Sequence, residues 1–142
     1  MRVFISSYKC FSLAIPIKYV SSVMLNTENY ETKFFYNQEN RSTYVSLPVL
    51  FKCPQEIVRH GIIIKNTGTQ DGETENKYVL LGTEIENESD IPFDKIYPVP
   101  RTLGLLQFSL IFSGISFNKI SGGLILLLNP EHLIQNIQKE LL

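Results

Sequence analysis

The stretch GGLILLLNPEHLI, residues Gly122 to Ile134, joins an apolar run to an abrupt polar turn. Five consecutive aliphatic residues follow the glycine pair, which is the length and composition of a buried β-strand. Asn129 is a good N-cap residue, and Pro130 suits the first helical position because it has no amide hydrogen to leave unpaired. Glu131 lies at the positive end of the helix dipole. The pattern predicts a strand that leads directly into a C-terminal helix.

The predicted C-terminal helix has a narrow apolar stripe. Leu133, Ile137 and Leu141 recur at every fourth residue, whereas the residues between them are mostly polar. A stripe of this kind packs one face of a helix against a hydrophobic core and leaves the other face in water. We expect this helix to cover or brace a β-sheet.

The rest of the chain has the rhythm of short strands separated by polar turns. Its 142 residues are enough for one domain with a sizeable core. A polar segment with two glycines, Lys65 to Lys77, predicts a long hairpin connection, and Pro54 and Pro92 predict turns. The expected strands are Arg2–Ser6, Phe11–Ile15, Lys33–Tyr36, Thr43–Leu50, Gly61–Lys65, Tyr78–Ile85, Phe108–Phe117 and Gly123–Leu128. This spacing favours a β-barrel fold.

Charge and cysteine content exclude several classes of protein. The 13 basic and 14 acidic residues nearly balance, so no strong overall field favours nucleic acid or anionic lipid. Cys10 and Cys53 are too few for a secreted disulfide scaffold and lack the spacing of a zinc site. The uncharged stretch between Arg101 and Lys119 is too short for a spanning helix and contains two glycines. The low cysteine content favours a reducing cytoplasm.

The sequence contains no recognisable catalytic motif. His60 and His132 are the two histidines, and neither lies near a set of metal ligands. A nucleophile elbow and a phosphate-binding glycine loop are both absent. The acidic stretch TEIENESD, Thr83 to Asp90, is compatible with a cation site but matches no calcium loop. We interpret it as a solvated strand edge, where charges oppose aggregation.

The densest aromatic group is KFFY, Lys33 to Tyr36. Aromatic rings of this kind can stack on nucleobases. Basic residues are not interleaved with them, so use in the core or at a protein interface is the better interpretation.

Two early stretches resemble segments of the CheW family. FSLAIPIKYVSSV, Phe11 to Val23, is similar to a family strand that passes through a turn into an aliphatic pattern. RSTYVSLPVL, Arg41 to Leu50, resembles the family pattern RGxxxPVxDL. Here Ser42, Ser46 and Val49 replace the usual glycine, proline and aspartate.

Two later stretches extend the resemblance over nearly the whole chain. YVLLGTEIENESDIPFDKIYPVP, Tyr78 to Pro100, is similar to a family strand that ends in IxPxP. IFSGISFNKISGGLILLLNPEHLI, Ile111 to Ile134, resembles the closing strand and capped helix. Asn129 takes the place of the usual aspartate, a mild change because both residues cap helices well.

This resemblance implies a mainly β fold, with two intertwined SH3-like five-stranded β-barrels and a short C-terminal helix. Residues 1–142 would form a single CheW-like domain with two barrel subdomains. The implied function is that of a non-catalytic cytoplasmic adaptor, which couples chemoreceptors to the histidine kinase CheA in bacterial chemotaxis. No cofactor, no nucleic acid and no membrane insertion are expected.

The family resemblance also implies binding residues. Family members pack one barrel on the regulatory domain of CheA and receive the receptor tip in the groove between the barrels. Carried over, Val20 and Arg41 belong to the receptor site, and Ile17 and Ser22 to the kinase site. An aliphatic residue buries a helix face, and a guanidinium orients carboxylates or carbonyls. Core packing remains the alternative for Val20, and a solvated hairpin position for Arg41.

The chain departs from the family near these residues. YNQEN replaces the glycine-bearing lead-in to Arg41, and Ser22 replaces a common glutamate. These departures leave a divergent CheW-like scaffold in another signalling complex open as an alternative. A second alternative, which rests on the KFFY group and neighbouring basic residues, is a small β-barrel that binds nucleic acid.

Overall fold

The computed structural model describes residues 1–8, 11–25, 32–51, 60–65, 77–82, 85–99, 111–120 and 122–141. The chain divides into two compact units. Unit 1 contains Met1–Ile17 and Ile85–Leu142, and unit 2 contains Lys18–Glu84. The sequence of unit 2 is therefore inserted between the two segments of unit 1.

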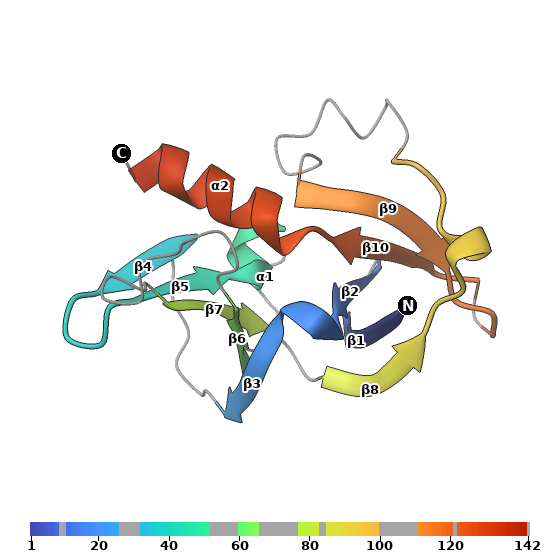
Figure 1. Ribbon diagram of the computed structural model, residues 1–142, viewed down its shortest axis with the longest axis horizontal. Coiled ribbons are helices and arrows are strands. Elements are labelled where there is room, and N and C mark those ends of the chain that lie inside the picture. The colour runs from blue at the N-terminus through green and yellow to red at the C-terminus, as the bar shows by residue number, and fades with distance from the viewer. Residues whose placement is uncertain are drawn as a thin grey trace. The chain divides into compact units, whose positions relative to one another are not determined.

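The described part of the chain contains ten strands and four helical segments (Figure 1). In unit 1 the elements are β1 Arg2–Ser7, β2 Ser12–Pro16, β8 Ile85–Asp90, η2 Phe93–Lys95, β9 Phe112–Phe117, β10 Leu124–Leu128 and α2 Pro130–Leu141. In unit 2 they are β3 Val20–Leu25, β4 Phe34–Asn37, β5 Ser42–Ser46, α1 Leu47–Leu50, β6 His60–Ile64 and β7 Lys77–Gly82. A short 3-10 helix, η1 Ile17–Tyr19, links β2 to β3.

The sheet of unit 1 has five strands in the order β8-β1-β2-β10-β9. β2 and β10 are parallel, and the other neighbours are antiparallel. Side chains from three strands and the segment after β8 form one buried cluster, which contains Val3, Ala14, Ile91, Ile125 and Leu127. β10 is buried along most of its length, as expected for its continuous aliphatic run.

The sheet of unit 2 also has five strands, in the order β3-β6-β7-β5-β4. β5 and β7 are parallel, and the other neighbours are antiparallel. The central strand β7 is buried from Tyr78 to Gly82. Val79 and Leu81 form a core cluster against Tyr44 and Ile63. The two strands that flank the predicted Lys65–Lys77 connection, β6 and β7, form the expected antiparallel pair, while residues 66–76 of that connection lie outside the described residues.

The two sheets have the same pairing pattern in a circularly permuted chain order. β8 corresponds to β3, the β1-β2 hairpin to β6-β7, and the β9-β10 hairpin to β4-β5. In both sheets the parallel pair joins the two hairpins. A helix follows the second strand of the equivalent hairpins, α1 after β5 and α2 after β10. Each unit is therefore one copy of the same architecture.

The equivalent hairpins also have equivalent turns. Asn37 pairs with Ser42 across a four-residue loop, and Asn118 bonds to Gly123 across a loop of the same length. The side chain of each asparagine accepts a hydrogen bond from the amide two residues later, at 2.9 Å in both turns. Such asparagine turns fix the loop backbone locally.

The predicted start of the C-terminal helix is confirmed. The amide of His132 donates to Asn129 Oδ1 at 3.2 Å, and the amide of Asn129 donates to the Ile111 carbonyl at 2.6 Å. Leu133 and Ile137 are buried, as the apolar stripe predicts. The junction between β10 and α2 is thus fixed by the Asn129 cap and by a hydrogen bond to Ile111, the residue before β9.

The predicted fold class is confirmed, since the chain is mainly β with two five-stranded sheets and a C-terminal helix. The prediction was wrong for Thr43–Leu50, because the strand ends at Ser46 and α1 begins at Leu47. Pro48 lies in the first turn of α1, where it suits a helix and would remove a strand hydrogen bond. β3 and β8 were not predicted as separate strands. The predicted turn at Pro92 is confirmed as η2, whereas the one at Pro54 lies outside the described residues.

Candidate functional site

β3 forms one edge of the unit 2 sheet and exposes apolar side chains. Val23, Met24 and Leu25 have 41%, 37% and 79% of their surfaces exposed. β3 pairs with β6 on its inner side, so its outer backbone groups lie at the sheet edge. An exposed apolar edge strand can pair with other chains, and proteins normally prevent this with charged residues. Where such charges are missing, the exposed apolar surface marks a binding site for a partner.

Two of the predicted site residues, Val20 and Ser22, lie at the start of β3, and Ile17 precedes that strand in the chain. Ile17 is half-buried in η1 and is the last residue of the first segment of unit 1. Val20 is half-buried and opposes Ile64, whereas Ser22 is exposed and opposes Ile63. The register shifts between Val20 and Ser22, and such a bulge turns the side chains that follow it. The amide of Lys65 donates to the Tyr19 carbonyl at 2.8 Å and fixes this entry to β3.

Arg41, the fourth predicted residue, ends the β4–β5 turn with an exposed side chain and a φ of 53°. Its carbonyl accepts a hydrogen bond from the Lys77 amide at 3.0 Å. The next amide, that of Ser42, donates to Asn40 Oδ1 at 3.1 Å, and Asn40 Nδ2 donates to the Tyr44 hydroxyl at 3.1 Å. These hydrogen bonds fix the backbone around Arg41 and hold this residue in the left-handed region.

Strand register places Val20 and Arg41 at the same end of the unit 2 sheet. Val20 opposes Ile64, Ile64 opposes Tyr78, and Tyr78 opposes Thr43, two residues after Arg41. With neighbouring strands about 4.8 Å apart, this row spans about 14 Å along the sheet. Val20 on β3 and Arg41, immediately before β5, thus lie at one end of the sheet, with β6 and β7 between β3 and β5.

The opposite edge of the same sheet is also apolar. Phe35 and Tyr36 on β4 are exposed, and the ring of Phe35 lies 6.4 Å from that of Tyr44. The sequence indicated either a core or an interface for this KFFY group, and these two rings are on the surface. Both edge strands of unit 2 therefore expose apolar side chains. In the sequence, the signal for these two surfaces was the pair of apolar runs without alternation, VML and FFY.

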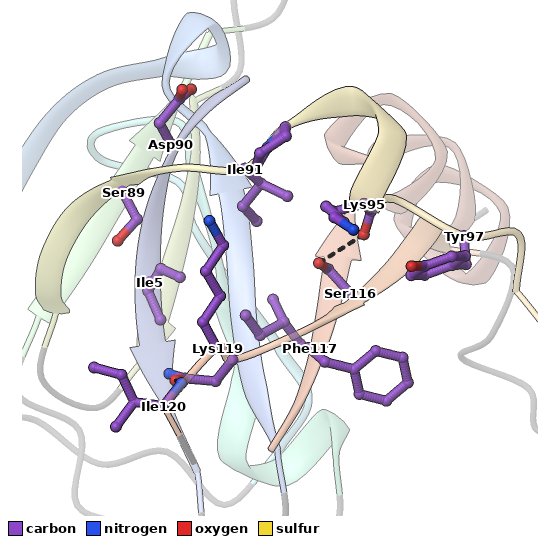
Figure 2. Close-up of a pocket in the computed structure, with 13 residues that line it drawn as sticks. Ile5, Ser89, Asp90, Ile91, Lys95, Tyr97, Ser116, Phe117, Lys119 and Ile120 are labelled. Atoms are coloured by element: carbon purple, nitrogen blue, oxygen red, sulfur yellow. Dashed lines mark hydrogen bonds between the residues drawn. The ribbon is translucent and has the colours of Figure 1, made fainter. Parts of the chain in front are cut away.

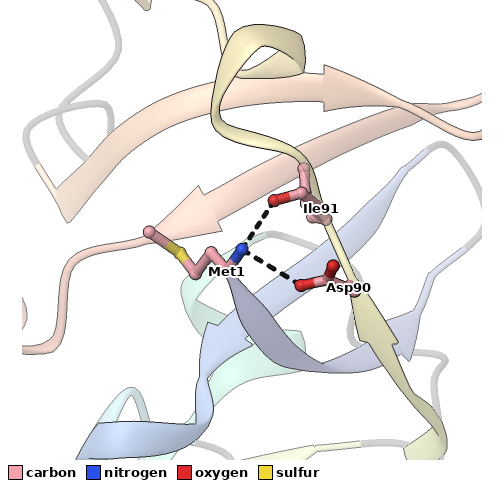
Figure 3. A network of polar contacts seen from close by, with 3 residues as sticks. All are labelled: Met1, Asp90 and Ile91. Carbon is pink, nitrogen blue, oxygen red and sulfur yellow. Dashed lines mark hydrogen bonds and ion pairs between the residues drawn. The ribbon is translucent and has the colours of Figure 1, made fainter.

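Unit 1 holds its acidic edge strand by ion pairs (Figure 3). The N-terminal ammonium of Met1 donates to Asp90 Oδ1 at 3.1 Å and to the Ile91 carbonyl at 2.8 Å. Arg2 pairs with Glu88 at 2.6 Å. β8 lies at the edge of its sheet, as predicted for the acidic stretch. Among the described residues, no group of three or more His, Cys, Asp or Glu side chains is placed to hold a metal ion.

The two mixed five-stranded sheets and the C-terminal helix define a CheW-like fold. The comparison that identifies it is with the crystal structure of the scaffolding protein TtCheW from Thermoanaerobacter tengcongensis. The TM-score is 0.64 and the sequence identity 13%, over 89% of this chain and 82% of that chain. No family model matches the sequence, and no curated protein matches it either. Within the described ranges, every helix is too short or too polar to cross a membrane.

Proposed function

We propose that this protein is a non-catalytic cytoplasmic adaptor that couples chemoreceptors to a CheA-type histidine kinase in bacterial chemotaxis. Residues 1–142 would act as one domain, without a cofactor. Two findings support the proposal, the fold similarity to a scaffolding protein and an exposed apolar edge strand in unit 2.

The single observation that carries the proposal is the exposure of Val23, Met24 and Leu25 on β3. An edge strand with this composition gains free energy when a partner covers its apolar side chains and pairs with its backbone. We assign the regulatory domain of the kinase to this edge, with Ile17 and Ser22 as contact residues.

We assign the receptor tip to the end of the unit 2 sheet that carries Val20 and Arg41. Val20 would cover apolar surface of a receptor helix, and the guanidinium of Arg41 would hold carboxylates or carbonyls. The left-handed backbone at Arg41 supports this assignment, because a strained arginine is retained more readily when its side chain has a task.

Calorimetric titration with the CheA regulatory domain from the same genome tests the proposal. We expect saturable binding that Ile17→Glu abolishes and that Ile120→Glu, the same change at an exposed residue of unit 1, leaves unchanged. Absence of binding to every cognate kinase and receptor would overturn the proposal. Equal loss in both variants would reject the assigned contact.

The second candidate is a divergent scaffold that serves another signalling complex. It is favoured by the absence of a matching family model and by the departures at Ser42, Ser46 and Val49. Kinase binding without receptor binding would favour this candidate over the first.

A further inference from the structure

Unit 1 contains a pocket that is separate from the residues assigned to kinase and receptor. Its volume is about 500 Å³, within the range of natural ligand pockets. Ile5, Ile91 and Ile125 supply apolar lining, and Ser116 and Lys95 bound it on another side. The Ser116 hydroxyl donates to the Lys95 carbonyl at 2.8 Å and ties β9 to η2 there (Figure 2).

The charged groups of this pocket are mainly cationic. Lys95 and Lys119 both line it, and Figure 2 shows the Lys119 side chain extending into it. Asp90 also lines the pocket, but its carboxylate pairs with the Met1 ammonium. Among the described residues, neither lysine forms an ion pair. The pocket lining therefore includes two lysines, and its one carboxylate already has a cationic partner.

The pocket is bordered by large apolar side chains that point into solvent. Ile120, at the tip of the β9–β10 turn, is 98% exposed, and Phe93 on η2 is 73% exposed. Tyr97 and Phe117 are also exposed, and their ring centroids lie 6.2 Å apart. Tyr97, Phe117 and Ile120 all line the pocket, and exposed apolar residues that are grouped in this way mark interaction surfaces.

We propose that this Lys95–Lys119 pocket binds an extended acidic segment of a partner protein. One apolar side chain of the segment would enter between Ile5, Ile91 and Ile125, and carboxylates on either side of it would meet Lys95 and Lys119. The unmatched ammonium groups select for negative charge, and the concave apolar interior selects for a side chain that can fill it. A lipid surface would meet the protruding residues but would leave the concavity unfilled. The inference does not depend on the proposed coupling of receptor and kinase.

The test is a titration of the isotopically labelled full chain with the peptide EDLFED, followed by backbone amide NMR. We expect saturable shifts that concentrate at Ser89–Lys95 and Ser116–Ile120. The peptides KKLFKK and EDAAED are the controls for charge and for the apolar anchor, and both should bind more weakly. Absence of shifts, shifts centred elsewhere, or equal binding of KKLFKK would overturn the proposal.

A double charge reversal separates the pocket from general electrostatics. Lys95→Glu with Lys119→Glu should weaken EDLFED binding by about tenfold or more, whereas Lys18→Glu with Lys65→Glu, two exposed lysines of unit 2, should change it little. Ile120→Ser, which removes an apolar side chain and leaves the charge unchanged, should also weaken binding. Sedimentation with phosphatidylserine vesicles tests the membrane as the alternative partner. Vesicle binding that requires Lys95 and Lys119, together with an absence of peptide-induced shifts, would show that the surface binds a membrane and would overturn the proposal of a protein segment.

Discussion

Arg41 and Gly122 occupy the same position in two equivalent hairpins, and both have a left-handed backbone, with φ of 53° and 72°. Each is the last residue of a four-residue loop that begins after an asparagine. Glycine adopts this conformation without strain, whereas a residue with a Cβ does not. Unit 1 therefore has the expected glycine at this turn, whereas unit 2 has an arginine, which lowers the free energy of unfolding.

Replacing this arginine should stabilise the protein. Left-handed strain of about 1–2 kcal/mol exceeds the extra unfolded-state entropy of glycine, about 0.4–1 kcal/mol. We expect Arg41→Gly to raise the free energy of unfolding by about 0.5–1 kcal/mol, measured by urea denaturation. Gly122→Ala is the matched control and should lower it, because no residue beyond its chain neighbours lies within 4 Å of the added methyl group and the backbone strain exceeds the entropy gain. A less stable Arg41→Gly variant would contradict this account.

The same substitution should harm receptor binding. Hydrogen bonds from a guanidinium to charged or carbonyl groups contribute about 1.5–3 kcal/mol, so losing them should weaken binding to a receptor-tip hairpin by about tenfold or more. Titrations of Arg41→Gly and Arg41→Lys against the receptor tip would measure this. The lysine variant keeps the charge but lacks the planar fork, so it should recover only part of the affinity. Unchanged receptor affinity in Arg41→Gly would remove Arg41 from the receptor site.

The C-terminal helix should depend on Asn129. Its side chain accepts the His132 amide at 3.2 Å, and alanine would leave that amide without the cap. We expect Asn129→Ala to lower the free energy of unfolding by about 1 kcal/mol, whereas Asn129→Asp should be nearly neutral. Urea denaturation followed by circular dichroism distinguishes the two. If aspartate were as harmful as alanine, the hydrogen bond would not be the stabilising contact.

The elements that the sequence predicted well are those with local signals. β10 and α2 follow from an uninterrupted aliphatic run, an asparagine cap and a proline at the first helical position. β3 and β8 were missed because VSSVML and IENESD lack the alternation of apolar and polar residues by which strands are recognised. The parallel pairings β2-β10 and β5-β7 join segments far apart in the chain, which no local pattern reveals.

The candidate site was predictable only in part. Family resemblance pointed to Val20 and Arg41, and register places both at one end of the unit 2 sheet. The left-handed backbone of Arg41 depends on the turn around it and has no signature in an arginine itself. The Lys95–Lys119 pocket combines residues from β1, β8, η2, β9 and β10, so its lining becomes visible only once those elements are assembled.

Gly114 should be intolerant of a larger residue. A methyl group there would lie 2.7 Å from Ile96 Cγ2 and 3.1 Å from the Tyr97 carbonyl oxygen. Tyr97 exchanges two backbone hydrogen bonds of 2.8 Å with Ile115, the next residue of β9, so the segment cannot shift without weakening them. We expect Gly114→Ala to lower the free energy of unfolding by about 1–3 kcal/mol.

The double variant Gly114→Ala with Ile96→Ala tests the stated cause. Removing Cγ2 relieves the shorter of the two contacts, so the combined loss in unfolding free energy should be smaller than the sum of the single losses. Strictly additive losses would mean that Ile96 is not the residue that excludes a side chain at position 114.

A substitution at Leu25 on β3 should affect binding without affecting folding. Its side chain is 79% exposed, so Leu25→Asp should change the free energy of unfolding by no more than about 0.5 kcal/mol. A charge on β3 would nevertheless oppose burial against a partner, and binding to the kinase regulatory domain should weaken by about tenfold or more. Ile120→Asp, at a residue of unit 1 that is 98% exposed, should leave kinase binding intact. The reverse result, with kinase binding lost in Ile120→Asp and kept in Leu25→Asp, would move the docking surface from unit 2 to unit 1, because the two variants differ in location and hardly in chemistry.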